Sequence, residues 1–207
     1  GDRVPVLWPP GLSPLSREWV VTNIAAESIP EARISTNIAF GDLQRDVLPK
    51  ESIDASIAIK NAKIKYLPEH PETTKVDAVV HIDGVALDAA IESAHFLSDT
   101  KISKGRVLIE DLNAENPYIK VGFDAHAPAG DVVKFLELPR LGHAQRLNLR
   151  SEQAQGSAKG HVDVGFNFFS PRDSEGKPIA EPEVDYAVAA EVEGVTHPGF
   201  MKKFDVK

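Results

Sequence analysis

The stretch that decides the fold is "VDAVVHIDGVALDAAI", residues 76–91. Apolar side chains alternate along both of its halves, at Val76, Ala78, Val80 and Ile82 and then, on the opposite parity, at Val85, Leu87, Ala89 and Ile91. Such alternation is typical of strands that bury one face. An Asp83-Gly84 turn of type I′ between them would place Ile82 opposite Val85. The parity change then keeps every apolar side chain on one face of a hairpin.

A second change of phase lies in "ASIAIKNAKIKYL", residues 55–67. Ala55, Ile57 and Ile59 share one parity, whereas Ala62, Ile64 and Tyr66 share the other. Lys60 and Asn61 form either a tight turn or a β-bulge that bends one long strand without losing its apolar face. We favour the bulge because Lys-Asn is a poor type I′ pair beside Asn-Gly or Asp-Gly.

Further strand patterns cover residues 31–40, 105–112, 118–125, 160–169 and 183–192. In the first, "EARISTNIAF", the side chains of Ile34, Thr36, Ile38 and Phe40 alternate with polar neighbours. Short helices are predicted at 14–24, with Ser13 as the N-cap and Pro14 at the first helical position, and at 129–138, before Pro139. The segment 170–178 is a polar loop rich in turn formers.

These patterns predict a mainly β protein: a long, curved antiparallel sheet that forms an open, taco-like groove, with two short helices. We expect a single β-rich domain over residues 1–207, with a first sheet segment at 31–127 and a second at 145–195. Such a chain is long enough to bury a core. Gly1 looks like a tag remnant, so we expect an excised fragment of a longer protein whose targeting segment lies elsewhere.

Composition excludes several classes of function. The net charge is −8, with 31 acidic and 23 basic residues and no dense cluster of Lys or Arg along the sequence, which argues against nucleic acid as a partner. The absence of cysteine excludes disulfides, thiolate metal sites and thiol nucleophiles. No apolar run approaches the roughly 20 residues of a membrane helix.

The sequence offers no constellation for catalysis. Its seven histidines never form an H-x-x-H or H-x-x-x-H pair, and His81 and His161 are out of phase with their apolar neighbours, so we expect both to face solvent. Residues Gly156–Gly160 read as a flexible loop before a strand. Glu110 and Asp111 are adjacent on a strand and therefore point to opposite faces. We expect no enzyme activity, no cofactor and no metal.

The apolar face is the candidate site. Aromatic residues make up only 7% of the chain, and the inward positions are mostly Val, Ile and Ala, which fill the space between two packed sheets poorly. We therefore expect an incompletely covered trough. Its predicted lining is Ile57, Ile59, Ile64, Tyr66, Val76, Val80, Ile82, Val85, Leu87, Ile91, Ile119, Val121, Phe123, Val162, Val164 and Phe166.

The most specific local motif is "YLPEHP", residues 66–71. Pro68 stops strand pairing and Pro71 stiffens the following loop, so Tyr66 ends its strand beside a rigid turn. This is foremost a structural corner. A tyrosine in this place could also mark the mouth of a groove.

The order of several motifs resembles the central region of the large AsmA-like, YhdP-like envelope proteins of Gram-negative bacteria. These motifs are "LWPPGLSPLSREWVVTNI", "IKNAKIKYLPEHPETTKVDAVVHIDGVALDAAI", "SKGRVLIEDL", "AGDVVKFLELPRLG" and "AQGSAKGHVDVGFNF". Matching positions are Trp8 and Pro9 at the start, Trp19 in the helix, and Tyr66, Pro68 and Pro71 in the turn. The family offers no catalytic residues to transfer. If the resemblance holds, we expect this chain to be a fragment without the family's membrane anchor and most of its length.

The resemblance implies a periplasmic protein, anchored to the inner membrane in its full-length form, with repeating β units that form a lipid-lined groove. Its partners would be phospholipids or other acyl-chain lipids and adjacent repeats of the same protein, with membrane contact through parts absent from this chain. The leading hypothesis is a segment of a conduit that carries phospholipid between the inner and outer membranes. The alternative is a structural or assembly module of the envelope that binds a protein through its sheet edge or apolar face. A hydrolase of envelope glycans or lipids is a distant third.

Overall fold

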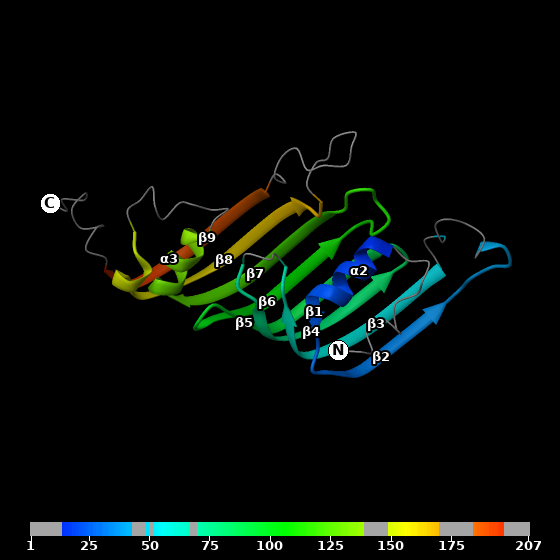
Figure 1. The fold of residues 1–207 in the computed structure, drawn as a ribbon, viewed down its shortest axis with the longest axis horizontal. Helices are drawn as coiled ribbons and strands as arrows, with labels where there is room; N and C mark the ends of the chain where they lie inside the picture. Colours follow the sequence, from blue (N-terminus) through cyan, green and yellow to red (C-terminus); the bar gives the residue numbers. More distant parts are fainter. Residues whose placement is uncertain are drawn as a thin grey trace.

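The protein is a single open antiparallel sheet with two short helices on one side. The computed structural model describes residues 14–42, 49, 52–66, 70–138, 149–169 and 184–196. The strands are β1 (Ile24–Ala25), β2 (Ser28–Thr36), β3 (Ile53–Ile64), β4 (Thr73–Asp83), β5 (Ala86–Phe96), β6 (Thr100–Ile109), β7 (Tyr118–Pro128), β8 (Gln155–Asn167) and β9 (Val184–Thr196). Within the described residues they run in the order β1-β3-β4-β5-β6-β7-β8-β9, with β2 also paired to β3 (Figure 1). The predicted fold class is confirmed.

The phase change at Lys60 and Asn61 is a β-bulge, as favoured. The strand β3 is continuous from Ile53 to Ile64, and its pairing with β4 shifts between Ile59 and Ala62. Asn61 lies in the left-handed region at φ 50°, which Asn tolerates better than most residues. Lys75 in β4 and Lys104 in β6 also have positive φ beside register shifts. A line of irregularities therefore crosses this part of the sheet and keeps the apolar face continuous.

The β4–β5 hairpin is present, but its turn lies one residue later than predicted. Asp83 pairs with Ala86 and Ile82 with Leu87, so the two loop residues are Gly84 and Val85 rather than Asp83 and Gly84. Gly84 has φ 60°, whereas Val85 is not among the residues with positive φ, as expected for glycine at the first position of a type II′ turn. Type I′ would need positive φ at both loop residues, which is costly for a β-branched valine.

Two further expectations were wrong. The strand β2 ends at Thr36, so Ile38 and Phe40 lie beyond it, and Phe40 is fully exposed. Residues Gly156–Gly160 belong to β8 rather than to a loop, because residues 157–160 pair with both β7 and β9. Trp8, Pro9, Pro68 and the predicted loop 170–178 lie outside the described residues.

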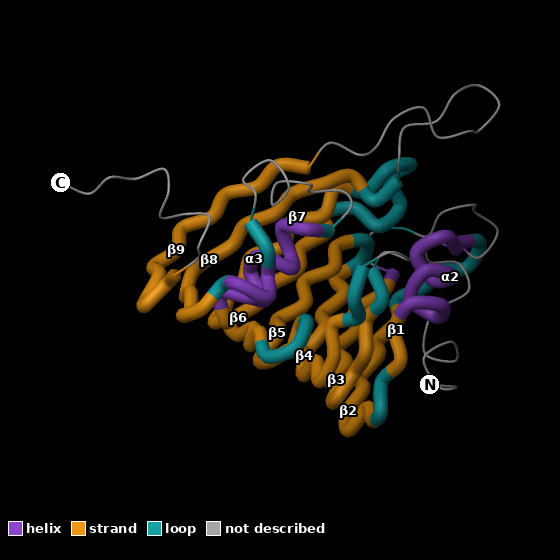
Figure 2. Tube along the Cα trace, turned by 60° about the vertical axis from the view of Figure 1, so that its left-hand side comes forward, coloured by secondary structure: helices purple, strands orange, loops and turns teal. Residues whose placement is uncertain are grey.

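Both predicted helices form. The helix α2 spans Pro14–Asn23 and α3 spans Ala129–Glu137, and both lie on the same side of the sheet (Figures 1 and 2). Within the described residues no helix is long and apolar enough to cross a membrane.

A buried carboxylate fixes α3 to the β5–β6 turn. Asp131, in the first turn of α3, is only 4% exposed. It accepts hydrogen bonds from the Ser98 hydroxyl at 2.5 Å, the Asp99 N–H at 2.8 Å and the Thr100 hydroxyl at 3.1 Å. Burial opposes ionisation of Asp131, but these three donors lower its pKa below the ordinary value. The charge is thus stabilised mainly by these hydrogen bonds, with a smaller contribution from the positive charge of Lys134.

The core consists of two clusters at opposite ends of the strands. We call one the Phe168 end, where β3 begins and where Ile53, Ile82, Leu112 and Ile119 are buried. Val20 of α2 and Phe168 pack against that cluster. The other is the Phe135 end, where Ala62, Val76 and Ala94 are buried beside partly buried Ile24, Ile64 and Ile102. Both clusters use side chains of the face that carries the helices.

Candidate functional site

The apolar side chains of successive strands lie in register on the helix-bearing face, which we call the inner face. One row across the sheet consists of Ala55, Ile82, Leu87, Ile109, Ile119, Phe166 and Val184. The next consists of Ile57, Val80, Ala89, Val107, Val121, Val164 and Tyr186. Each residue is the direct antiparallel partner of its neighbour in the row. The rows therefore form continuous apolar bands perpendicular to the strands.

The structure places fourteen of the sixteen predicted lining residues on this inner face. They are Ile57, Ile59, Ile64, Val76, Val80, Ile82, Leu87, Ile91, Ile119, Val121, Phe123, Val162, Val164 and Phe166. Val85 is the exception that sequence reasoning misplaced, because it lies buried in the β4–β5 turn.

Tyr66 lies just beyond β3 at the Phe135 end. Its ring stands edge-on to His70 and 6.4 Å from the ring of Phe96, which in turn is 6.0 Å from Phe135 of α3. Burial raises the pKa of Tyr66 to about 12. Tyr66 is thus part of an aromatic group that borders the inner face at this end.

A second aromatic group borders the Phe168 end. Trp19 of α2 packs edge-on against Phe168 at 5.4 Å, and Phe168 packs against Phe169 at 4.8 Å. The side-chain amide of Asn116 fixes this corner by bonding both the N–H and the carbonyl of Phe169. The apolar rows run between the two aromatic borders, across the strands.

The exposure of the inner-face side chains increases from β3 to β9. On β3 and β4, Ile53 and Ile82 are buried in the cluster against which Val20 of α2 packs, and Ile82 is only 4% exposed to solvent. On β7 and β8, Val121, Phe123, Val162 and Val164 are half-buried. On β9, Tyr186 is 64% and Val188 60% exposed. The inner face is therefore covered over β3 and β4 and exposed to solvent over β9.

Sequence reasoning missed the most exposed members of the face. Val184, Tyr186, Val188 and Val192 alternate in a stretch predicted as a strand, yet nothing in that stretch alone indicated that they continue the rows of β8. Val107 and Ile109 of β6 were missed in the same way. The alternation of these residues is visible in the sequence, whereas the strand order that joins them into rows is not.

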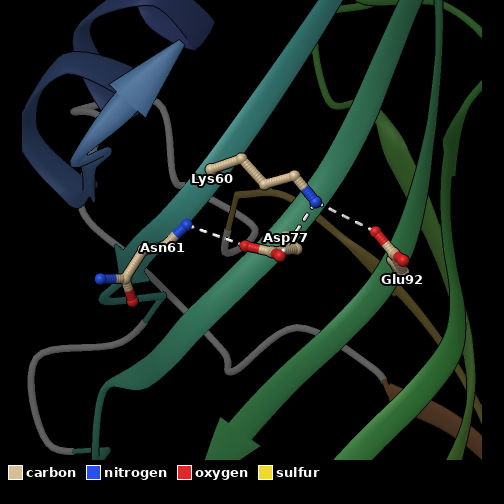
Figure 3. Close-up of polar contacts among 4 residues, drawn as sticks. All are labelled: Lys60, Asn61, Asp77 and Glu92. Carbon is tan, nitrogen blue, oxygen red and sulfur yellow. Dashed lines mark hydrogen bonds and ion pairs between the residues drawn. The ribbon is translucent and has the colours of Figure 1, made fainter. Parts of the chain in front are cut away.

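The outer face is polar and held by cross-strand ion pairs. Lys60 Nζ lies 3.0 Å from Asp77 and 3.1 Å from Glu92, and Asp77 also accepts the backbone N–H of Asn61 at 2.9 Å (Figure 3). The bond from the Asn61 N–H, followed by the one from Lys60, lowers the pKa of Asp77. The bulge thus offers an extra N–H to the carboxylate that pairs with the neighbouring lysine.

The same pattern continues toward β8. Arg106 binds Asp88 with two nitrogens, at 2.6 and 2.9 Å, and Lys120 lies 2.7 Å from Glu110. Asp124 lies 2.8 Å from His161 Nδ1 and 2.9 Å from Lys104. The bond to Asp124 raises the pKa of His161. These exposed pairs align the strands, and Lys60, Glu92, Lys104 and Arg106 also line an open hollow of about 390 Å³ on the outer face.

Chemistry-bearing side chains do not converge in the part of the chain that the structure describes. No three of its His, Asp and Glu residues are placed to hold a metal ion. Glu110 pairs with Lys120, whereas Asp111 accepts the N–H of Asn113, so these neighbours face different partners. His81 and His161 are both exposed, as predicted.

Comparison with known proteins adds no relative: no family model, no curated protein and no solved structure matches this chain. The resemblance to AsmA-like proteins therefore remains a prediction from the order of motifs.

Proposed function

We propose that the inner face binds the acyl chains of phospholipids and that this chain is a segment of an envelope conduit that carries phospholipid between the inner and outer membranes. The observation that carries the proposal is the exposure of Val184 and Tyr186 on β9, because they continue rows whose members on β3 and β4 are buried, at Ala55 and Ile82, or half-buried, at Ile57 and Val80. Contiguous exposed apolar surface of this kind marks a binding site.

The dimensions suit a hydrocarbon guest. Strands lie about 4.8 Å apart, so the rows from β3 to β9 extend about 29 Å across the sheet. One leaflet of a bilayer core is about 15 Å thick, half of the roughly 30 Å total. A single acyl chain would therefore fit along the rows, from the exposed strand β9 toward the covered strands β3 and β4.

The side chains of the inner face favour contact with the acyl chains of a lipid over contact with its head group. Each methylene removed from water stabilises the bound state by about 0.8 kcal/mol without any directional contact. The rows on β7, β8 and β9 consist of Val, Phe, Ile and Tyr, and their charged neighbours project to the other face. We therefore expect broad tolerance of different head groups.

Site-directed crosslinking tests the proposal. A photoreactive p-benzoylphenylalanine replaces Val188, which faces inward, or its neighbour Ala189, which faces outward on the same exposed strand. Expression in a Gram-negative host and illumination should yield phospholipid adducts, identified by mass spectrometry, at position 188 and not at 189. Equal labelling at both positions, or no lipid adduct at 188, would contradict a lipid-binding face.

The same experiment addresses the alternative, a structural or assembly module. That alternative is favoured by one observation, the exposure of β9 along its whole length from Val184 to Thr196. A protein strand added to this edge would cover the backbone rather than the inner rows. Protein adducts from both positions, without lipid, would favour the assembly module over the conduit.

A further inference from the structure

Basic side chains form a line on the outer face at the Phe135 end. Lys101, His126 and Lys159 are direct register partners across β6, β7 and β8, and His95 of β5 is the partner of Lys101. Lys63 of β3 and Lys75 of β4 continue the line, because the bulged residues Thr74 and Lys75 lie opposite Lys63. We call Lys63, Lys75, His95, Lys101, His126 and Lys159 the basic row.

The basic row differs from the rest of the outer face in its pairing. Lys60, Lys104, Arg106 and Lys120 each have a carboxylate within 3.1 Å. The four lysines of the basic row form no ion pair within the described part of the chain, and all four are exposed. No two of these lysines are direct partners: Lys101 lies between His95 and His126, and Lys159 lies between His126 and Glu191 of β9.

Charge is segregated along the strands. Acidic residues gather near the Phe168 end, at Asp54, Asp83, Glu110, Asp111 and Asp185. At the Phe135 end, the turns carry the exposed carboxylates Glu72 and Asp99, and β9 carries Glu191 and Glu193. Between the ion pairs and these turns, the titratable side chains on the outer face of β3 to β8 are thus all basic, although carboxylates flank them and the whole chain has a net charge of −8.

Apolar and aromatic groups lie at the same end. Phe135 of α3 is 41% exposed, and its ring packs against Phe96 beside Tyr66. Exposed aromatic side chains next to lysines are the usual pattern of proteins that lie in a membrane interface.

We infer that the Phe135 end docks on the surface of an anionic phospholipid membrane through the basic row. Lysines near such a surface are attracted to it within a Debye length, about 8 Å at physiological salt. The strands β4 to β7 have ten or eleven residues each, so their acidic ends lie about 30 Å or more from the docked end and are screened. The inference goes beyond acyl-chain binding and does not require it, so the two can fail separately.

Vesicle co-sedimentation tests the inference with the whole chain. The probes are vesicles of phosphatidylcholine alone and vesicles that also contain phosphatidylglycerol, each at low and high sodium chloride. Binding should require phosphatidylglycerol and weaken with salt. Each lysine near the surface should contribute about fivefold to binding. The double variant K101Q/K159Q should therefore reduce the partition coefficient between vesicles and water about 25-fold.

The matched control is R106Q/K120Q, which removes the same charge from paired positions nearer the Phe168 end. It should change binding by less than about twofold, because these charges lie beyond the screening length from the docked surface. Circular dichroism establishes that both variants are folded. Equal losses in the two variants, equal binding to vesicles without phosphatidylglycerol, or no binding at low salt would each overturn the inference.

Free phosphate and protein partners are separated in the same assay. Inorganic phosphate at an ionic strength matched with chloride should displace the protein from vesicles no better than chloride does. Stronger displacement by phosphate would identify a site for a single anion instead of a membrane surface. Failure to bind vesicles together with binding to an acidic protein would replace the membrane as the partner.

Discussion

The strands β3 to β5 and the strands β7 to β9 share the same alternation of apolar and polar residues. Their inner side chains nevertheless differ, because those of the first group are largely buried and those of β9 are exposed. On the β3–β5 side the β3–β4 and β4–β5 pairings each shift register twice, and Asn61 and Lys75 have positive φ at these shifts. On the β7–β9 side the β7–β8 pairing runs from Tyr118 to Pro128 without a shift, the β8–β9 pairing shifts between Gln155 and Ser157, and Val188 is 60% exposed. Alternation specifies which face is apolar, but segments distant in sequence decide whether that face becomes core or surface.

Truncation of inner-face side chains should show the largest difference between the two sides. Ile82→Ala should lower the free energy of unfolding by about 3 kcal/mol, because it removes buried methylenes and leaves a cavity. Val188→Ala should lower it by less than about 0.5 kcal/mol, since this exposed side chain leaves no cavity. Urea denaturation followed by circular dichroism measures both. Similar losses for the two variants would show that β9 is covered.

Loss of the Asp131 carboxylate should have the next largest effect. Asp131→Ala leaves the Ser98 and Thr100 hydroxyls and the Asp99 N–H without their acceptor, which should cost about 2 kcal/mol. Because the folded pKa of Asp131 is lowered, its contribution is present above the ordinary pKa of 3.8 and is lost as pH falls through the folded value. Denaturation at neutral pH and below pH 3.8 checks both parts. A variant as stable as the parent at neutral pH would contradict this account of the α3 anchor.

The bulge can be compared with a regular strand by one substitution at two places. Asn61→Val forces a β-branched residue into positive φ and should cost about 1–2 kcal/mol. Asn167→Val, at the exposed end of β8, should change stability by less than about 0.5 kcal/mol, because valine suits an extended strand. Equal effects would mean that Asn61 does not hold the bend. Asn61→Gly provides the rescue, since glycine accepts this conformation.

The smallest effect concerns the ion pairs of the uncovered side. The pKa of His161 is raised by its bond to Asp124, so its contribution is complete below the ordinary value of 6.5 and is lost as pH rises through the folded pKa. The urea midpoint of the parent should therefore fall slightly across that range relative to His161→Gln. Parallel pH profiles for the two proteins would show that this exposed pair contributes nothing measurable.

Much of the fold could be predicted because each strand carries its own alternation. The bulge at Lys60-Asn61 and both helices followed from phase and capping signals. The hairpin turn was misplaced because Asp-Gly also fits a frame in which glycine is first, and Gly84-Val85 preserves the same inner face. Gly156–Gly160 was misread as a loop because glycines in an edge-proximal strand give the same local signal as a turn.

The site was only partly predictable for a different reason. Alternation identifies inward residues on each strand, but the register that unites Phe166 with Val184 depends on pairing between segments far apart in sequence. The basic row was invisible for the same cause, because β3, β4, β6 and β8 contribute one lysine each and the line exists only across strands. The anchor at Asp131 likewise joins α3 to a turn that precedes it by more than thirty residues.

The central claim is that the inner face over β7 to β9 is open and takes up hydrocarbon. Because the chain has no cysteine, a single nitroxide label can be placed by Val188→Cys or, as the outward control, by Ala189→Cys. Electron paramagnetic resonance with and without added short-chain phosphatidylcholine, below its micelle concentration, reports label mobility and exposure to oxygen. The account predicts reduced mobility and a more apolar environment at position 188 alone. Lipid-independent spectra at position 188, in a protein shown to be folded, would contradict it.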